Sequence, residues 1–404
     1  MLVQSKSSAS NSELSAFSLN NNRPLSRPWA IATRVILIRH GRSTYNQQGR
    51  YQGRCDRSVL TERGLEDAYR TGGFLQQIQQ LATSDPIGTI YTSPLQRTRQ
   101  TANQILAVLG NIETLSPRLK VDRNLEEIDM SSWQGLTYQY VRENFPEEYR
   151  CWQERPHEFE SPAGTKPLQD LYQRARLFWS EILSRHKGET IAIVSHGGTN
   201  RALMATAMGM STDRYHALQQ CNCGVSILQF PADSTKPARL SALNLTTHLG
   251  RNLPKLKNGK SGLRLLLLPT ETPHRQVRQV ARFLHPQSPN VILSTDLERS
   301  TQIAESLLES HSSTVHLQVL RDDIVWNWAE VMKSRPVGTS QVGASQKPQL
   351  VTGLAIVPQA TISTFVQKLC SCSSLTINPG TLSVLHFPQE RSQPTLQALI
   401  PMSG

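Results

Sequence analysis

Short apolar runs alternate along this chain with longer segments of helical periodicity. Residues 35–38 and 191–194 are uninterrupted apolar runs, a pattern typical of strands that are buried on both faces. Residues 65–75 and 168–186 instead place their apolar side chains at helical spacing. Strands that alternate with helices predict an α/β fold of three layers, in which helices cover both faces of a doubly wound, mainly parallel sheet.

The order of the predicted strands recurs in the second half of the chain. The matching pairs of segments are 34–38 with 264–268, 90–97 with 291–299, 191–194 with 354–357, and 224–231 with 380–388. An internal repeat of this length predicts two tandem domains of similar fold. We place the first domain at residues 31–231 and the second at residues 263–404.

The segments outside the two predicted domains differ in composition. Residues 1–30 are rich in Ser and Asn and lack the apolar region of a signal peptide, so we expect a disordered leader and a cytoplasmic protein. Their scarcity of acidic residues also resembles a plastid transit peptide, so the chloroplast stroma is the alternative location. Residues 232–262 form a basic stretch that we interpret as a solvated linker. Residues 138–166 are a polar excursion suited to a lid or specificity element.

The formal net charge of +12 favours anionic ligands. It fits phosphorylated metabolites, and neither an aromatic-rich basic RNA-binding pattern nor an apolar run long enough to cross a membrane is present. We therefore expect a phosphorylated small molecule as the partner, with no nucleic acid and no membrane. The six cysteines lack the spacing of a zinc site, so we expect reduced thiols and no metal.

Side chains suited to phosphate chemistry follow two of the predicted strands. Directly after 35–38 come Arg39, His40 and Gly41, with Ser43 and Asn46 close behind. The carboxyl ends of strands are where open α/β sheets place ligands. A guanidinium presents a planar fork of donors to phosphate, an imidazole is a nucleophile at neutral pH, and Gly allows close backbone approach. The pattern predicts a phosphate site in which His40 is the attacking group.

Three more motifs follow in order along the chain. Ser93 and Pro94 open a helix that carries Arg97 in its first turn, Leu125 precedes Glu127 by two positions, and His196 and Gly197 follow the strand at 191–194. Together with Arg39 to Gly41 and Asn46, this set resembles the histidine phosphatase superfamily, which includes phosphoglycerate mutase-like members. The resemblance covers residues 34–230.

The resemblance implies a role for each of these side chains. His40 would carry a phosphohistidine, Arg39, Arg97 and His196 would bind the phosphoryl oxygens, and Glu127 would act as general acid and base. Neutral contacts to the substrate would come from Gly41, Ser43, Asn46 and Gly197. The resemblance implies neither a metal nor another cofactor.

The reaction implied is hydrolysis of a sugar phosphate. The run EIDMSSWQGL at 127–136 looks more like the phosphatase members than the mutases. The 69 positions from Glu127 to His196 also leave less room for the insertion typical of mutases. The alternatives are a phosphoglycerate mutase, a protein phosphatase, or a scaffold that uses the second half.

The second copy keeps the strand pattern and loses the chemistry. Pro269, Thr270 and Glu271 stand where the first copy has Arg, His and Gly, and Gln359 replaces the second His. Arg299 keeps the place of the helical arginine. The second domain is therefore expected to be a degenerate, inactive histidine-phosphatase-like domain that stabilises, regulates or dimerises the first, which makes a dimer possible.

Overall fold

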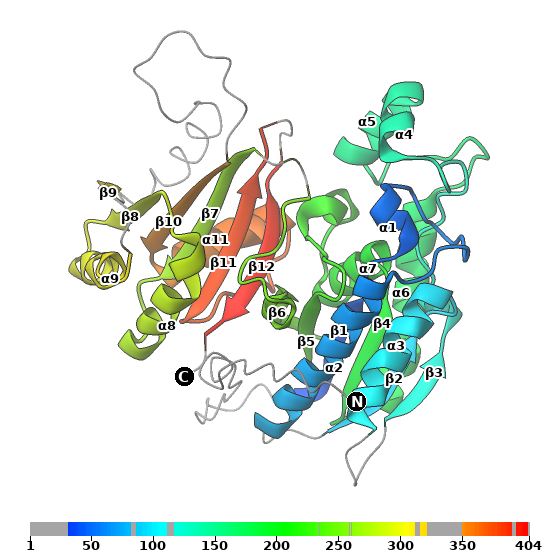
Figure 1. The fold of residues 1–404 in the computed structure, drawn as a ribbon, viewed down its shortest axis with the longest axis horizontal. Helices are drawn as coiled ribbons and strands as arrows, with labels where there is room; N and C mark the ends of the chain where they lie inside the picture. Colours follow the sequence, from blue (N-terminus) through cyan, green and yellow to red (C-terminus); the bar gives the residue numbers. More distant parts are fainter. Residues whose placement is uncertain are drawn as a thin grey trace, which may run out of the picture.

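The computed structural model describes most of the chain as one mixed α/β structure (Figure 1). The described residues are 31–81, 86–110, 117–233, 235–257, 259, 261–311, 316–320, 350–389 and 393–402. The expected leader at 1–30 lies outside them. Within the described part of the chain, no helix is long and apolar enough to span a membrane.

The first half of the chain contributes six strands to the sheet. These are β1 (Ile31–Arg39), β2 (Ile87–Thr92), β3 (Arg118–Val121), β4 (Thr190–Ser195), β5 (Val225–Pro231) and β6 (Arg239–Leu245). Strands β1 to β4 pair in parallel in the order β3-β2-β4-β1, and β5 and β6 add to β1 in antiparallel fashion. This arrangement confirms the predicted α/β class and the mainly parallel sheet.

The second half repeats this arrangement strand for strand. Its strands are β7 (Gly262–Pro269), β8 (Val291–Thr295), β9 (His316–Leu320), β10 (Leu350–Val357), β11 (Thr381–Phe387) and β12 (Thr395–Pro401). Their order, β9-β8-β10-β7-β11-β12, is the order of the first half with each number raised by six. The two halves meet at an antiparallel pair of β6 and β12, so all twelve strands form one continuous sheet.

The basic stretch at 232–262 is not a plain linker as expected. It contains strand β6 (Arg239–Leu245), whose apolar side chains Leu240, Ala242, Leu243 and Leu245 are buried, followed by the 3-10 turn η4 (Thr247–Leu249). The apolar residues between the cations were the signal that this prediction overlooked. Only the residues after η4 form the connector to β7.

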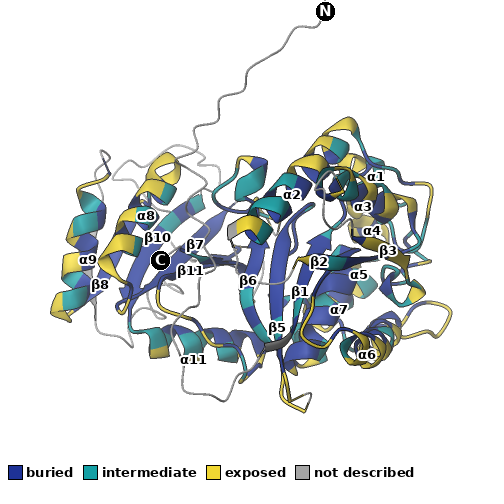
Figure 2. Ribbon diagram, turned by 90° about the horizontal axis from the view of Figure 1, so that it is seen from below, coloured by how far each residue is buried: buried dark blue, intermediate teal, exposed yellow. Residues whose placement is uncertain are grey.

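Helices cover both faces of the sheet (Figure 2). One face carries α2 (Glu62–Leu81), α3 (Gln96–Leu109), α8 (His274–Leu284) and α9 (Glu298–Leu308), and the other carries α6 (Pro167–Arg185), α7 (Gly197–Met208) and α11 (Gln359–Cys370). Shorter elements are α1 (Thr44–Gln48), α4 (Tyr138–Asn144), α5 (Pro146–Glu154), η2 (Arg123–Leu125), η3 (Thr212–Ala217) and η5 (His285–Gln287).

Strand β1 shows why its apolar run is uninterrupted. Val35 and Leu37 pack into the cluster under α6, α7 and α11, whereas Ile36 and Ile38 pack into the cluster under α2, α3, α8 and α9. Successive side chains of a strand point to opposite faces, so a strand between two helical layers is apolar at every position. The same packing holds the end of β1 rigid where the candidate site begins.

Candidate active site

The two candidate histidines leave adjacent parallel strands at the same level. Residue Arg39 of β1 pairs with Ser195 of β4, and the next residue of each strand is His40 or His196. The backbone N–H of His40 donates to the carbonyl of Ser195 at 2.9 Å. The two rings lie edge to face with centroids 5.3 Å apart. The structure therefore brings both imidazoles to one point at the carboxyl edge of the sheet.

The hydrogen bonds of His40 determine which ring nitrogen is free to react. Its Nδ1 lies 2.7 Å from the carbonyl of Gly41, which only accepts, so Nδ1 carries the proton. The lone pair is then on Nε2. Burial, followed by the charges of Arg97 and Arg39, lowers the pKa of His40 well below 6.5. The ring is thus neutral at physiological pH, as a nucleophile must be.

His196 is equally buried and is held by a serine. Its Nε2 lies 2.9 Å from Oγ of Ser93, the residue before the proline that opens the α3 region. Burial and the charge of Arg97 lower the pKa of His196 well below 6.5. Among the described residues its buried Nδ1 has no hydrogen-bond partner. A buried polar atom without a partner costs free energy, which a ligand would offset here.

Arg39 and Arg97 are fixed by backbone carbonyls. Arg39 donates from Nη1 to Gln220 at 2.9 Å, and Arg97 donates from Nη1 to Cys55 and from Nη2 to Gly53, both at 2.8 Å. Burial lowers the pKa of Arg97 to about 10, so the side chain stays cationic at neutral pH. The Nε atoms of both arginines are buried without a hydrogen-bond partner in the described structure. Both therefore keep a donor available for an anion.

Glu127 lies at the amino end of α7, beside His196. Its carboxylate accepts hydrogen bonds from the backbone N–H groups of Gly198 and Thr199, each at 3.1 Å. The helix dipole favours a carboxylate at this end. Arg174 of α6 donates to the carbonyl of Glu127 at 3.3 Å and so holds the backbone of this loop from behind. The position of the expected acid and base is thus fixed on both sides.

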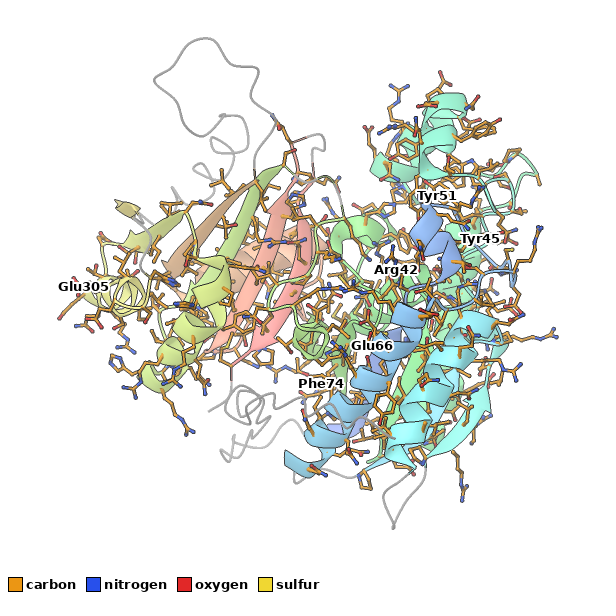
Figure 3. All side chains as sticks on the ribbon, viewed as in Figure 1. Arg42, Tyr45, Tyr51, Glu66, Phe74 and Glu305 are labelled. Atoms are coloured by element: carbon orange, nitrogen blue, oxygen red, sulfur yellow. The ribbon has the colours of Figure 1, made fainter. Side chains whose placement is uncertain are left out.

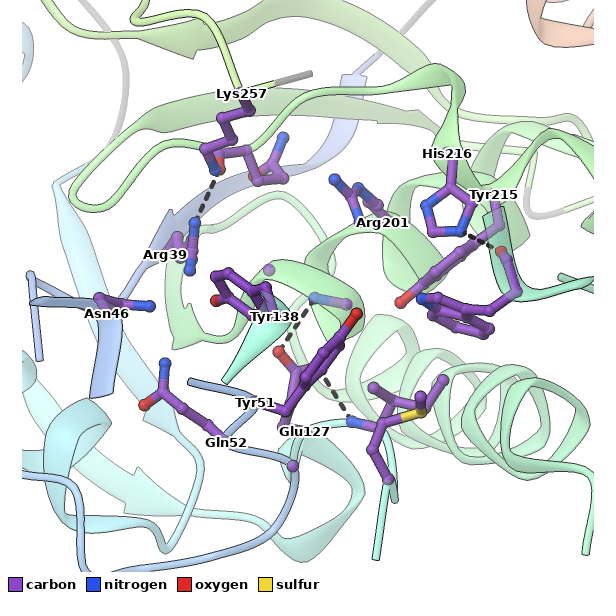
Figure 4. Close-up of a pocket in the computed structure, with 17 residues that line it drawn as sticks. Arg39, Asn46, Tyr51, Gln52, Glu127, Tyr138, Arg201, Tyr215, His216 and Lys257 are labelled. Carbon is purple, nitrogen blue, oxygen red and sulfur yellow. Dashed lines mark hydrogen bonds between the residues drawn. The ribbon is translucent and has the colours of Figure 1, made fainter. Parts of the chain in front are cut away.

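Asn46 reaches the site, whereas Ser43 does not. Oδ1 of Asn46 accepts from the backbone N–H of Ser43 at 3.3 Å and from Nδ2 of Asn222 at 2.9 Å, so the Asn46 amide nitrogen is turned toward the cavity (Figure 4). Ser43 is fully buried and caps α1, and its hydroxyl also donates to Gln52 at 2.9 Å. The expected substrate contact of Ser43 is therefore replaced by a positioning role: it orients Asn46.

An added side chain would meet neighbouring atoms at both predicted glycines, and Gly197 also lines the cavity. A Cβ on Gly41 would lie 2.5 Å from the carbonyl oxygen of Gly64 in α2, and a Cβ on Gly197 would lie 3.2 Å from Nε of Arg39. Gly198, which the sequence did not single out, is tighter still. Its Cβ would collide with the Glu127 carboxylate and the Tyr215 hydroxyl. These glycines let the side chains of Arg39 and Glu127 approach the backbone closely.

Arg39, Asn46, Glu127 and Gly197 line a cavity of about 190 Å³ (Figure 4), whereas the buried His40, Arg97 and His196 are not among its lining residues. Several of its lining residues were not predicted from the sequence, namely Tyr138, Trp152, Arg201, Tyr215, His216 and Lys257. Tyr138 and Trp152 come from α4 and α5, the excursion expected to act as a lid or specificity element. Arg201 lies in the first turns of α7, where its position after a second His-Gly pair was the available signal.

The equivalent place in the second half is filled by the chain itself. The carboxylate of Glu271 accepts from the backbone N–H of Gln359, the first residue of α11, at 2.9 Å. Arg299 occupies the second position of α9, as Arg97 does in α3, and donates to the carbonyl of Thr272 at 3.0 Å. The Glu271 carboxylate thus stands in the place of Gly41 and contacts Gln359, which stands in the place of His196.

The fold and this site define the class of protein. The family model described as "Histidine phosphatase superfamily (branch 1)" matches residues 35–242, about half of the chain. The chain belongs to this superfamily, which confirms the resemblance stated from its motifs.

Individual relatives carry more specific names. The chain is 39% identical over 232 residues to "Probable 2-carboxy-D-arabinitol-1-phosphatase" of Arabidopsis thaliana, which covers 57% of this chain and 44% of the relative. It is 35% identical over 250 residues to "2-carboxy-D-arabinitol-1-phosphatase" of Triticum aestivum, a match that covers 61% of this chain and 48% of the relative. It is 33% identical over 217 residues to "Phosphoserine phosphatase 1" of Hydrogenobacter thermophilus, a match that covers 54% of this chain and 94% of the relative. The chain spans about half the length of the two plant relatives.

Proposed function

We propose that this chain is a metal-independent phosphomonoesterase that hydrolyses a sugar phosphate through a phosphohistidine on His40. The observation that carries the proposal is a neutral imidazole with its Nε2 lone pair free, placed beside the second histidine at a ring distance of 5.3 Å. Arg39 and Arg97 supply the positive charge, and Glu127 supplies a carboxyl group on the same side.

In the first step, Nε2 of His40 attacks phosphorus as the bond to the ester oxygen breaks. Arg39, Arg97 and His196 would hold the equatorial oxygens, whose charge must be stabilised in the transition state. The Asn46 amide adds a neutral donor. Glu127 in its protonated form would give its proton to the leaving oxygen, and the sugar departs as an alcohol. The carbonyl of Gly41 holds the Nδ1 proton of the phosphorylated ring.

In the second step, water attacks the phosphohistidine. The Glu127 carboxylate, ionised by the first step, would take a proton from that water as the bond between phosphorus and Nε2 of His40 breaks. Inorganic phosphate leaves, and both the imidazole and the carboxylic acid are restored. One group thus serves as acid and then as base.

We propose 2-carboxy-D-arabinitol 1-phosphate, or a related sugar phosphate that inhibits the carboxylase Rubisco, as the first substrate to test. The names of the two plant relatives support this choice. So do the segments at 127–135, 151–159 and 221–228, which resemble 2-carboxyarabinitol-1-phosphatases. The name of the bacterial relative makes phosphoserine the necessary comparison.

We further propose that residues 263–404 are a degenerate domain of the same fold that stabilises the first. Support comes from the repeated strand order and from Thr270 and Gln359, which stand where the first half has His40 and His196. The shared β6–β12 edge gives this half a structural role, because an exposed sheet edge is a site of aggregation.

The experiment is a phosphate-release panel with and without EDTA. It compares carboxylated and neutral sugar phosphates, phosphoserine, a phosphopeptide, and 3-phosphoglycerate with a bisphosphate primer. We expect release from sugar phosphates in EDTA, its loss in His40→Asn, and full activity in the matched variant of an exposed histidine, His285→Asn. Faster isomerisation than release would indicate a mutase, and preference for the phosphopeptide would indicate a protein phosphatase. Activity that survives His40→Asn or disappears in EDTA would refute the mechanism.

A further inference from the structure

A second cavity, of about 250 Å³, adjoins the candidate active site. Asn46 and Lys257 line both cavities, so these two side chains form their common wall. The other lining residues make this second cavity strongly basic. Its ionisable side chains are one carboxyl, Asp67, and five basic groups, Arg42, Arg63, Arg251, Lys255 and Lys257; burial lowers the pKa of Lys257 well below 10.5, so the firm cations are the other four.

The cations come from three separate parts of the chain. Arg42 follows His40 by two positions and lies between α1 and the start of α2 (Figure 3). Arg63 belongs to the first turn of α2, a helix of 20 residues whose amino end favours anions. Arg251, Lys255 and Lys257 belong to the connector from β6 to β7, and Lys257 reaches in above Arg39 (Figure 4). The connector between the two halves therefore completes this site.

These charges are poorly compensated by the protein. The one carboxyl, Asp67, lies 4.0 Å from Arg63 and also interacts with the charge of Arg251, and among the described residues Arg42, Arg251 and Lys255 form no ion pair within 4.0 Å. The charge of Arg251 is the main cause that lowers the pKa of Lys255. Like charges held together beside a cavity are unfavourable until an anion enters.

We propose that this cavity binds a second anionic group of the substrate whose phosphate reacts at His40. The preferred substrates are then phosphomonoesters that carry a carboxylate or a second phosphate at some distance from the reacting group. This inference rests on the proposed function, because it requires the first phosphate at the active site. Because Asn46 and Lys257 line both cavities, a substrate that places one anionic group in each cavity would extend past these two side chains.

The test uses two matched pairs of substrates. 6-Phosphogluconate differs from glucose 6-phosphate by a distal carboxylate, and fructose 1,6-bisphosphate differs from fructose 6-phosphate by a second phosphate. We expect the anionic member of at least one pair to have the higher kcat/KM, and the better pair identifies the group. In Arg251→Gln/Lys255→Gln this preference should fall about tenfold or more, as expected for lost charged hydrogen bonds.

The control variant is Arg278→Gln/Arg282→Gln, which removes the same charge from the exposed face of α8 and should keep the preference. The single variant Lys255→Gln, at an exposed position, repeats the test if the double variant unfolds. Two results would overturn this inference alone. The first is an enzyme that hydrolyses p-nitrophenyl phosphate but does not favour the anionic member of either substrate pair. The second is a preference for the anionic member that survives in Arg251→Gln/Lys255→Gln. Failure to hydrolyse any phosphomonoester would overturn the proposed function and this inference with it.

Discussion

His40 and His196 meet edge to face, with ring centroids 5.3 Å apart and ring planes inclined by 64°. They are 156 positions apart in sequence, and the parallel pairing of β1 with β4 brings them together. Because Arg39 is in register with Ser195, each strand delivers its histidine at the same height. The chemistry proposed here depends on that register.

The pH dependence of the reaction should report the lowered pKa of His40. Burial and the charges of Arg97 and Arg39 keep this ring neutral below pH 6.5, so the nucleophile is not lost as the pH falls through that value. We expect kcat/KM for p-nitrophenyl phosphate, corrected for ionisation of the substrate, to stay level from pH 7.5 to about 6. A fall centred on pH 6.5 would contradict the environment described for His40.

Glu127→Gln should separate the two chemical steps. The amide cannot take a proton from water, so we expect the second step to slow by about 100-fold or more. p-Nitrophenolate leaves without much protonation, so the first step should remain fast with that ester. The expected result is a burst of p-nitrophenolate followed by slow turnover, with acid-labile phosphate bound to the protein.

The burst assay has its own control. His40→Asn in the Glu127→Gln background should give neither a burst nor bound phosphate, because the acceptor nitrogen is gone. Bound phosphate that persists in that double variant would place the covalent intermediate on another residue.

Gly198→Ala should reduce activity strongly because of a steric effect on Glu127. The added Cβ would collide with the Glu127 carboxylate and the Tyr215 hydroxyl, so the acid and base must move. Gly73→Ala in α2 is the matched control, since nothing lies within 4 Å of its added Cβ. The control should stabilise the protein by about 0.5 to 1 kcal/mol and keep its activity. Equal activity of the two variants in a phosphate-release assay would show that Glu127 is not positioned as described.

Much of the site could be predicted because its residues sit at strand ends. The apolar runs before Arg39 and His196 mark buried strands, and the carboxyl ends of parallel strands meet at one edge. Ser43 was misplaced because its sequence signal is ambiguous. A serine near a phosphate site can bind a ligand or cap a helix. In the structure Ser43 forms a capping box with Asn46, so it caps α1.

The cations of the connector could not be placed from sequence. The position of Lys257 depends on the pairing of β6 with β12, two strands that are far apart in the sequence. This pairing joins the two halves of the sheet and directs the connector past α2. A basic segment looks the same in sequence whether it is solvated or lines a cavity. The strand within this segment was missed for a related reason, since its cations masked the burial of Leu240 and Leu243.

His248 should make the stability of the protein depend on pH. Its ring stacks on Phe74 with centroids 4.6 Å apart, and burial lowers its pKa from 6.5 to about 4. Below pH 6.5 the unfolded chain binds a proton that the folded chain does not, so the free energy of unfolding falls as the pH falls toward 4. This one group contributes a slope of at most about 1.4 kcal/mol per pH unit. His248→Phe keeps an aromatic ring on Phe74 and removes the titration. Urea unfolding of both proteins between pH 7 and 4.5 should therefore show a shallower loss of stability in His248→Phe, and parallel curves would mean that His248 titrates normally in the folded state.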